Sequence, residues 1–237
     1  MKALIKKILG EELTGVIDYH RHPKMGSGMG GPFNAQVFRQ KIFGEVMQKI
    51  KFAAIVETGS FHGTTSEYMF KNSGLTVYTV ESQPRNYGFT KTRFRKNPGV
   101  KPHLGDSRQF LRDLTRNQEL QGKHLFFYLD AHWSADLPLR EEIEIIYGTW
   151  PDAVIMIDDF QVPTDSDYRY DDYGVGKSLT LDYLSPLRNM KLAAFFPSAR
   201  GADETGAKRG CILLAKDAAS VASLQSLPSL AAHGLVQ

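Results

Sequence analysis

The sequence predicts an α/β protein built on a doubly wound, mostly parallel β-sheet, and three observations support this fold class. Short apolar runs alternate with helix-length segments from residue 53 to about residue 187, which is the pattern of βαβ units. Five such runs end in an acid or in a Gly-Asp step, at the edge where parallel sheets bind ligands. The first run enters its helix through a turn with two glycines, where a ligand can contact bare backbone.

The five apolar runs provide the parallel strands. Buried parallel strands read as continuous apolar runs because helices cover both faces of the sheet. The runs are Ala53–Glu57, Val77–Glu81, the segment that ends before Gly105, Leu125–Asp130 and Ala153–Asp159. We expect the accompanying helices at residues 64–72, 84–96, 107–116, 136–148 and 176–188.

Near the C-terminus the alternation of strands and helices stops. Two apolar runs, Met190–Phe196 and Gly210–Ala215, flank the connector Arg200–Gly206 with no helix between them. Such a pair predicts an antiparallel hairpin, which brings the sheet to seven strands. Residues 218–237 are expected to form a short helix and a loose terminus.

The first 50 residues are expected to form a helical extension or cap, and residues 51–237 the main domain. The stretch Met25–Pro32 contains four glycines in eight residues, which predicts a hinge-like loop. An apolar stripe at helical spacing predicts a helix from Phe33 to Lys51. This part of the chain fits either a cap over a ligand or a helix packed on the sheet behind a disordered linker. We favour packing for the helix and leave both alternatives open for the loop.

Composition narrows the class of protein. The chain has 237 residues, of which 42% are hydrophobic and 23% charged, as in a single soluble domain with extensions. A net charge of +3 argues against a nucleic-acid partner. Cys211 is the only cysteine, which excludes an intramolecular disulfide and a cysteine metal cluster. No apolar run approaches the roughly 18 residues of a membrane span, so we expect a cytoplasmic protein without membrane contact.

The turn after the first strand, Glu57-x-Gly59-x-x-x-Gly63, limits the kind of ligand that it can bind. Its glycines let a ligand approach the backbone, and a helix N-terminus follows. Glu57 would repel a phosphate, so a cationic or neutral ligand fits better than a nucleotide phosphate. His62, inside the turn, is expected to be a spacer with a backbone contribution and not a catalytic residue.

These motifs, in this order, resemble those of the class I S-adenosyl-L-methionine-dependent methyltransferases, which have a Rossmann-like fold ending in an antiparallel hairpin. The resemblance covers roughly residues 50–215. It implies that Glu81 holds the ribose hydroxyls of the cofactor, and that Asp106 and Ser107 flank its adenine. The residues implied in cofactor binding are Glu57, Gly59, Ser60, Gly63, Thr64, Glu81, Asp106, Ser107 and Asp130.

Three carboxylates, those of Asp130, Asp158 and Asp159, follow two strands that should be neighbours. Clustered oxygen donors suit a hard divalent cation such as Mg²⁺, which would also offset their mutual repulsion. The spacing of 28 residues from Asp130 to Asp158 resembles that of metal-dependent O-methyltransferases of the catechol and caffeoyl-CoA type. The Asp-Asp pair itself is more similar to macrolide and aminocoumarin sugar methyltransferases. In the alternative interpretation these aspartates cap loops and bind backbone amides without a metal.

The segment Asp130-Ala-His132-Trp133 offers two candidates for the general base and does not decide between them. His132 is the first choice for a base acting on a substrate hydroxyl, because its unperturbed pKa is near neutral. Asp130, acting through a metal-bound hydroxyl, is the second. The catechol-type enzymes carry a lysine just after this position, where this chain has Ser134. Trp133 fits either the floor of the substrate pocket or ordinary packing.

A long loop after the fifth strand lies at the edge of the sheet where acceptors bind. Its tyrosines can stack on sugar or aromatic rings, and its acids can bind hydroxyls. We interpret this loop as a lid over the acceptor, with a solvated polar loop as the alternative. The tyrosines assigned to the substrate are Tyr168, Tyr170 and Tyr173.

Together these features predict a methyltransferase that acts on an oxygen of a small molecule or sugar, with S-adenosyl-L-methionine and Mg²⁺ as cofactors. Three alternatives stay open. They are a metal-independent N- or carboxyl-methyltransferase, a nicotinamide dehydrogenase, and a non-catalytic protein that keeps the cofactor fold. The dehydrogenase is weakened because the glycine turn lacks a Gly-x-Gly pair. The oligomeric state is also open, although the N-terminal helix offers a surface for a homo-oligomer.

Overall fold

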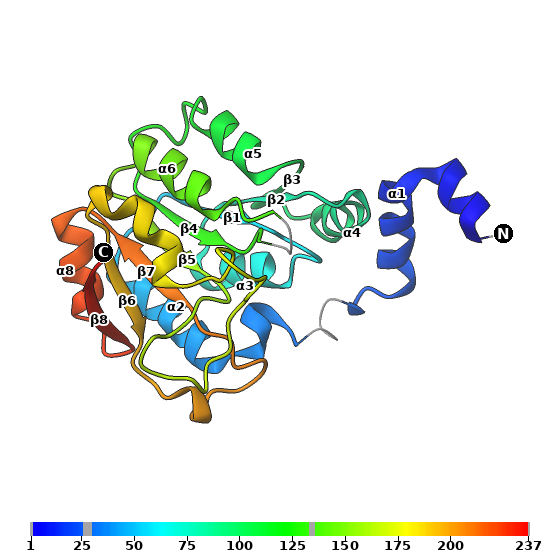
Figure 1. Ribbon diagram of the computed structural model, residues 1–237. Helices are drawn as coiled ribbons and strands as arrows, with labels where there is room; N and C mark the ends of the chain where they lie inside the picture. Colours follow the sequence, from blue (N-terminus) through cyan, green and yellow to red (C-terminus); the bar gives the residue numbers. More distant parts are fainter. Residues whose placement is uncertain (1, 26–29, 133–135, 237) are drawn as a thin grey trace.

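The computed structural model describes residues 2–25, 30–132 and 136–236, with the backbone alone for residues 2–9. It contains one mixed β-sheet with helices on both faces (Figure 1). The strand order is β3-β2-β1-β4-β5-β7-β6-β8. The strands are β1 (Ala54–Thr58), β2 (Val77–Glu81), β3 (Val100–Leu104), β4 (Leu125–Leu129), β5 (Val154–Ile157), β6 (Ala193–Pro197), β7 (Ile212–Ala215) and β8 (Leu230–Leu235).

Strands β1 to β5 are parallel. Strands β2 and β3 are added on one side of β1, and β4 and β5 on the other, so the strand order reverses between β1 and β4. Val56 of β1 is flanked by Tyr78 of β2 on one side and by Phe127 of β4 on the other. Doubly wound sheets bind ligands where the strand order reverses. The carboxyl ends of β1 and β4 are therefore the expected place for a site.

Alternate residues of each strand enter one of two hydrophobic cores, as the two-residue period of a strand requires. Ala54 and Val56 pack with α5 (Ser107–Leu114) and α6 (Leu139–Thr149), while Ile55 packs with the helices of the opposite face. That face is covered by α2 (Val37–Lys49), α3 (Thr64–Ser73) and α8 (Ala218–Gln225). Burial on both faces explains why these strands are continuously apolar.

Most of the expected helices are present, and one is wrong. The structure has α3, α4 (Pro84–Phe94), α5 and α6 near the predicted positions. The helix expected at 176–188 is replaced by an irregular loop, the single turn α7 (Leu181–Leu184) and the 3₁₀ segment η3 (Ser185–Met190). Asp172 ties this loop into a local turn by accepting hydrogen bonds from Gly174 N at 2.9 Å and Ser178 Oγ at 2.6 Å. Such side-chain bonds to nearby groups compete with helix formation.

The C-terminus also differs from expectation, because it ends in an eighth strand and not in a loose tail. The hairpin of β6 and β7 is confirmed, and β8 adds antiparallel to β6 from Ala193↔Leu235 to Pro197↔Leu230. Leu230, the first residue of β8, and Val236, which follows the strand, are buried and anchor it to the sheet. The predicted count of seven strands is therefore short by one.

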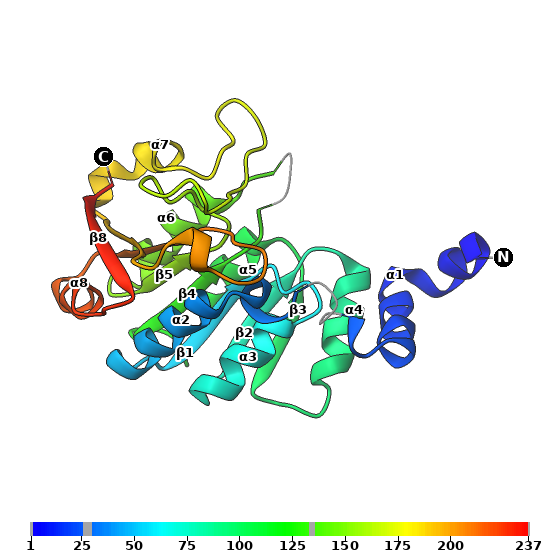
Figure 2. The ribbon, with the colours of Figure 1, turned by 90° about the horizontal axis from the view of Figure 1, so that it is seen from below.

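Helix α1 (Lys2–Arg21) leaves the body of the molecule beside α4 (Figures 1 and 2). It breaks at Gly10, whose φ of 71° and ψ of 163° are non-helical. The predicted hinge includes residues 26–29, which lie outside the described residues, and α2 then packs on the sheet as the stripe predicted. No helix in the described part of the chain combines the length and apolar character needed to cross a bilayer.

Candidate active site

The turn between β1 and α3 requires glycine at two positions. Gly59 has a φ of 85°, and a Cβ there would overlap the carbonyl oxygen of Asp130. Gly63, with a φ of 75°, precedes α3, which begins at Thr64. The turn closes through a hydrogen bond from Gly63 N to Ser60 O at 2.7 Å. The backbone of β1 thus lies directly against the end of β4.

Ser60 contributes a buried hydroxyl at this turn. The residue is 6% exposed, and its Oγ has no hydrogen-bond partner among the described residues. Buried polar atoms of native proteins are nearly always paired with protein, water or ligand. Together with the N-terminus of α3, this free hydroxyl marks the turn as a ligand cradle.

Glu57 lies buried at the end of β1, where two hydroxyl groups donate to its carboxylate. Thr79 Oγ1 donates to Oε2 at 2.6 Å, and Ser66 Oγ donates to the same oxygen. Burial raises the pKa of Glu57 to about 7, although these hydrogen bonds act in the opposite direction. A cationic group of a ligand would stabilise the ionised form.

Glu81 ends β2 and lies under the same turn. Its two carboxylate oxygens accept hydrogen bonds from Phe61 N and Gln83 N, each at 2.8 Å. Burial raises its pKa even though these backbone bonds oppose the shift. Each oxygen can accept another hydrogen bond, so the carboxylate remains available to ligand hydroxyls.

Asp106 has a structural role at the N-terminus of α5. Its side chain caps the helix by accepting from Arg108 N at 2.9 Å and Gln109 N at 3.3 Å. Side-chain hydrogen bonding from Arg108 lowers the pKa of Asp106, which keeps the carboxylate ionised. The next residue, Ser107, is buried beside Glu142 of α6.

A second group of side chains follows β4 and β5. Ligating atoms of Asp130, His132 and Asp159 all lie within 4.8 Å of one another. Nε2 of His132 is 4.0 Å from Asp130 Oδ1 and 3.9 Å from Asp171 Oδ2, and it has no hydrogen-bond partner in the described chain. Burial lowers the pKa of His132 to about 4, so its ring is neutral, with Nε2 unpaired among the described residues.

Asp158 corrects the predicted metal set, because the structure turns it away from this group. It forms a buried ion pair with Arg39 of α2, and both partners are 1% exposed. Tyr128 Oη donates to its Oδ2, and Asp159 N donates to its Oδ1 at 2.7 Å. With both oxygens engaged by protein, Asp158 is an anchor for α2, and His132 joins Asp130 and Asp159 instead.

The buried ion pair of Arg39 was not predicted from the sequence, although the position of this residue indicated one. Arg39 lies three and four residues before Ile42 and Phe43, on the apolar stripe of α2. A charged residue on the buried face of a helix indicates a buried ion pair. The identity of its partner depended on the tertiary packing.

Arg209, just before β7, was also missed. Its guanidinium pairs with Asp159 Oδ1 at 2.9 Å and with Asp171. It therefore compensates one of the three carboxylates of Asp130, Asp159 and Asp171, and two carboxylates are left without an Arg or Lys partner in the part of the chain that the structure describes. Burial and the nearby charge of Asp159 raise the pKa of Asp130 well above its usual range. Keeping Asp130 ionised beside Asp159 is therefore unfavourable unless a positive charge binds there.

The tyrosines of the long loop divide between core and site. Tyr168 is 2% exposed in the hydrophobic core and donates to Ala199 O at 3.2 Å, so its predicted role toward a substrate is wrong. Tyr173 faces the acids, since its hydroxyl donates to Asp171 and lies 3.4 Å from His132 O. Tyr170 is half-buried on the same loop, and Trp133 lies outside the described residues.

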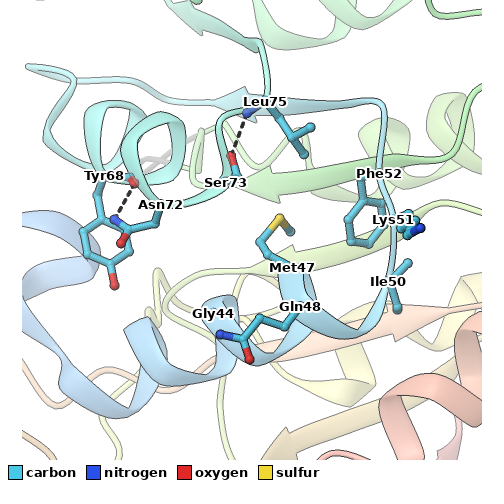
Figure 3. A pocket seen from close by; sticks show the side chains of 10 residues that line it. All are labelled: Gly44, Met47, Gln48, Ile50, Lys51, Phe52, Tyr68, Asn72, Ser73 and Leu75. Carbon is cyan, nitrogen blue, oxygen red and sulfur yellow. Dashed lines mark hydrogen bonds between the residues drawn. The ribbon is translucent and has the colours of Figure 1, made fainter.

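A cavity of about 420 Å³ lies elsewhere, between α2 and α3 (Figure 3). Met47 and Gln48 of α2 line one side, and Tyr68 of α3 faces them. The cavity also contacts Phe52 and Leu75, which precede β1 and β2. It is therefore at the amino ends of the strands, on the opposite edge of the sheet from the acids.

Comparison with known proteins identifies the fold. No protein-family model and no curated protein matches the chain. Among solved structures, it is similar to an O-methyltransferase from Bacillus cereus in complex with SAH (TM-score 0.53, 16% identity, 75% of this chain and 81% of that one). It is also similar to the O-methyltransferase TomG from Streptomyces achromogenes in complex with SAM (TM-score 0.55, 16% identity, 75% and 79%). A third is the SAH-bound methyltransferase PaMTH1 of Podospora anserina (TM-score 0.54, 14% identity, 75% and 76%). The chain has the fold of the class I S-adenosylmethionine-dependent O-methyltransferases.

Proposed function

We propose that this protein is an S-adenosylmethionine-dependent O-methyltransferase that acts on a hydroxyl of a small molecule or sugar, with a divalent cation such as Mg²⁺. One observation carries the proposal. A glycine cradle at the end of β1 lies directly beside the group of Asp130, His132 and Asp159 at the ends of β4 and β5. Cofactor and acceptor sites would then meet at the reversal of the strand order.

The cradle fits the cofactor. Gly59 lets the turn pack against the carbonyl of Asp130, which brings the cradle beside the end of β4, and Ser60 Oγ, unpaired among the described residues, can bind the cofactor. Glu57 would bind the cationic end of the methionine portion, and Glu81 would accept hydrogen bonds from the ribose hydroxyls. The end of β3, with Ser107 buried behind it, would bound the adenine, while Asp106 holds the start of α5 in place.

The acidic group fits a divalent cation. Two uncompensated negative charges and the free Nε2 of His132 are the donor set, with Asp130 and Asp159 as carboxylate ligands. A bound divalent cation would lower the pKa of an acceptor hydroxyl. Asp130 and Asp159 would orient that hydroxyl beside the glycine cradle, so that positioning supplies much of the rate. If instead Nε2 of His132 stays off the cation and accepts the proton, the carboxylates of Asp130 and Asp171, about 4 Å from that nitrogen, would stabilise the imidazolium.

A metal-independent methyltransferase is the second candidate, and Arg209 favours it. Its guanidinium already bridges Asp159 and Asp171, and so it provides part of the positive charge that a cation would bring. In that case the acids would bind acceptor hydroxyls directly.

A turnover assay separates these functions. We expect the protein to transfer labelled methyl groups from S-adenosylmethionine to catechol or to a glycoside with a vicinal diol, in Mg²⁺ and not in EDTA. Equal rates in both conditions would support the metal-independent enzyme. Cofactor binding without transfer to any acceptor of a broad panel would instead support a non-catalytic protein of this fold.

The raised pKa of Glu57 predicts how cofactor affinity depends on pH. Below its pKa of about 7 the carboxyl group is protonated in the free protein and cannot pair with the ammonium group of S-adenosylhomocysteine. The dissociation constant should therefore fall by up to about tenfold between pH 6 and pH 7.5, before the amino group of the ligand begins to lose its proton. Calorimetric titration at several pH values measures this change. The Glu57→Gln variant should bind more weakly with a flat profile over the same range, and a flat profile in the unmodified protein would contradict the role of Glu57.

A further inference from the structure

The cofactor turn contains a residue in a strained conformation, Phe61. Its φ of 46° lies in the left-handed region, which bulky side chains rarely adopt. Its backbone N donates to Glu81 Oε2 at 2.8 Å, and its carbonyl oxygen accepts from Thr90 Oγ1 at 2.6 Å. Such strain persists only where the surrounding structure holds the residue. The placement of Glu81 is therefore linked to whatever holds Phe61.

The side chain of Phe61 is held by His62, which lies in a column of aromatic rings. His62 stacks on Phe61 with ring centroids 3.8 Å apart, and on Phe89 of α4 at 4.3 Å. Tyr19 of α1 meets Phe89 edge-on at 5.2 Å. We call these four residues, Phe61, His62, Phe89 and Tyr19, the ring column. It connects the cofactor turn with the N-terminal helix.

His62 is a packed ring more than a polar group. It is 7% exposed, its Nδ1 has no hydrogen-bond partner among the described residues, and burial lowers its pKa. The side-chain amide of Asn86 raises the pKa of His62 and lowers that of Glu81, so it lies close to both groups. The backbone oxygen of His62 accepts a hydrogen bond from Arg93 Nη1 at 3.0 Å. The imidazole is therefore fixed from both faces and from its backbone.

The far end of the ring column is anchored by the contact between α1 and α4. A Cβ at Gly15 would overlap Arg85 O, and one at Gly88 would overlap Glu12 O, so the two helices touch along their backbones. Ion pairs link Arg85 with Asp18 at 2.6 Å and Lys91 with Glu12 at 3.1 Å. The ring column is thus attached at this end to two closely packed helices, α1 and α4.

We infer that His62 is a positioning residue of the cofactor site: its ring, stacked between Phe61 and Phe89, holds the strained turn so that Phe61 N keeps its hydrogen bond to Glu81 and the carboxylate of Glu81 faces the ribose. The inference rests on the proposed function and deepens it. It assigns to the ring column, and through it to α1, an effect on the affinity for the adenosine part of the cofactor.

The test compares His62→Ala with His62→Phe by calorimetric titration of S-adenosylhomocysteine and of adenosine. We expect His62→Ala to weaken the binding of both ligands about tenfold, since it removes two ring contacts. His62→Phe keeps a flat ring in the stack and should bind within threefold of the unmodified protein. His233→Ala is the matched control, because His233 also packs on a phenylalanine, Phe196, at 5.4 Å but on β8. It should leave both affinities unchanged.

The outcomes separate the inference from the proposed function. Unchanged affinities in His62→Ala would overturn the inference while the cofactor site stands. Binding by His62→Phe as weak as by His62→Ala would also overturn it, because stacking would then not be the cause. If His62→Ala does not fold, as judged by denaturant unfolding, the phenylalanine variant still decides. Absence of binding by the unmodified protein would remove the proposed function itself.

Discussion

Replacing Arg39 by methionine is expected to lower the free energy of unfolding by about 3–5 kcal/mol. Arg39 and Asp158 form a fully buried ion pair that joins α2 to the end of β5. The variant leaves Asp158 with hydrogen bonds from Tyr128 and from Asp159 N, but without a compensating charge. Arg39 also donates to Gly210 O at 3.0 Å, a bond that methionine cannot make. Urea unfolding followed by circular dichroism measures the loss.

The matched control removes the charge that is left behind. The double variant Arg39→Met with Asp158→Asn should recover a large part of the lost stability, since no unpaired charge then remains in the interior. A loss below about 1 kcal/mol in the single variant, or no recovery in the double one, would contradict the buried pair. In that case Asp158 would be free to join the acidic group, as the sequence led us to expect.

The neighbouring aspartates Asp158 and Asp159 are expected to give opposite phenotypes. Asp159→Asn should lower kcat by roughly 10³-fold, because the several kcal/mol that a metal ion contributes to transition-state stabilisation correspond to such a factor. It should also weaken Mn²⁺ binding, measured by electron paramagnetic resonance. Asparagine suits this position because Asp159 has a φ of 53°, which asparagine tolerates better than most residues. The fold should therefore be retained.

Asp158→Asn serves as the comparison. It leaves Arg39 charged in the interior, so it should lower stability while the folded protein binds Mn²⁺ within threefold of the unmodified affinity. Equal loss of Mn²⁺ affinity in both variants would restore the original set of three aspartates. Loss of activity in Asp159→Asn without any measurable Mn²⁺ binding in the unmodified protein would favour the metal-independent enzyme, in which Arg209 compensates Asp159.

The fold was largely predictable because it rests on periodicity. Continuous apolar runs marked β1, β2, β4 and β5, whose residues are buried on both faces. Strand β8 was missed since its residues from Ala231 to Leu235 are exposed and its sequence has no alternation. Its place depends on pairing with β6, which is a tertiary contact. The prediction of a helix at 176–188 was wrong because the hydrogen bonds that Asp172 accepts from Gly174 and Ser178 stabilise a local turn at the start of a weak helical pattern.

The positions of the candidate site residues were predictable where these residues follow the ends of strands. Glu57, Glu81, Asp130 and Asp159 are placed by the sheet itself, and the structure brings them to one edge. The sequence could not separate Asp158 from Asp159, because adjacent residues point to different sides and the partner of Asp158 comes from α2. Arg209 could not be assigned to Asp159 either, because it precedes β7 and reaches the acid only through the tertiary fold. Long-range charge pairing thus sets which acids remain free.

The central claim is that the glycine cradle binds the methyltransferase cofactor, and calorimetric titration with S-adenosylhomocysteine tests it most directly. It should be run in Mg²⁺ and again in EDTA. We predict micromolar binding with one site per chain in both conditions, because Gly59, Ser60 and Gly63 of the cradle offer no ligand to the cation. No heat of binding up to millimolar ligand in either condition would contradict the claim and leave the chain with the fold of these enzymes but without their cofactor.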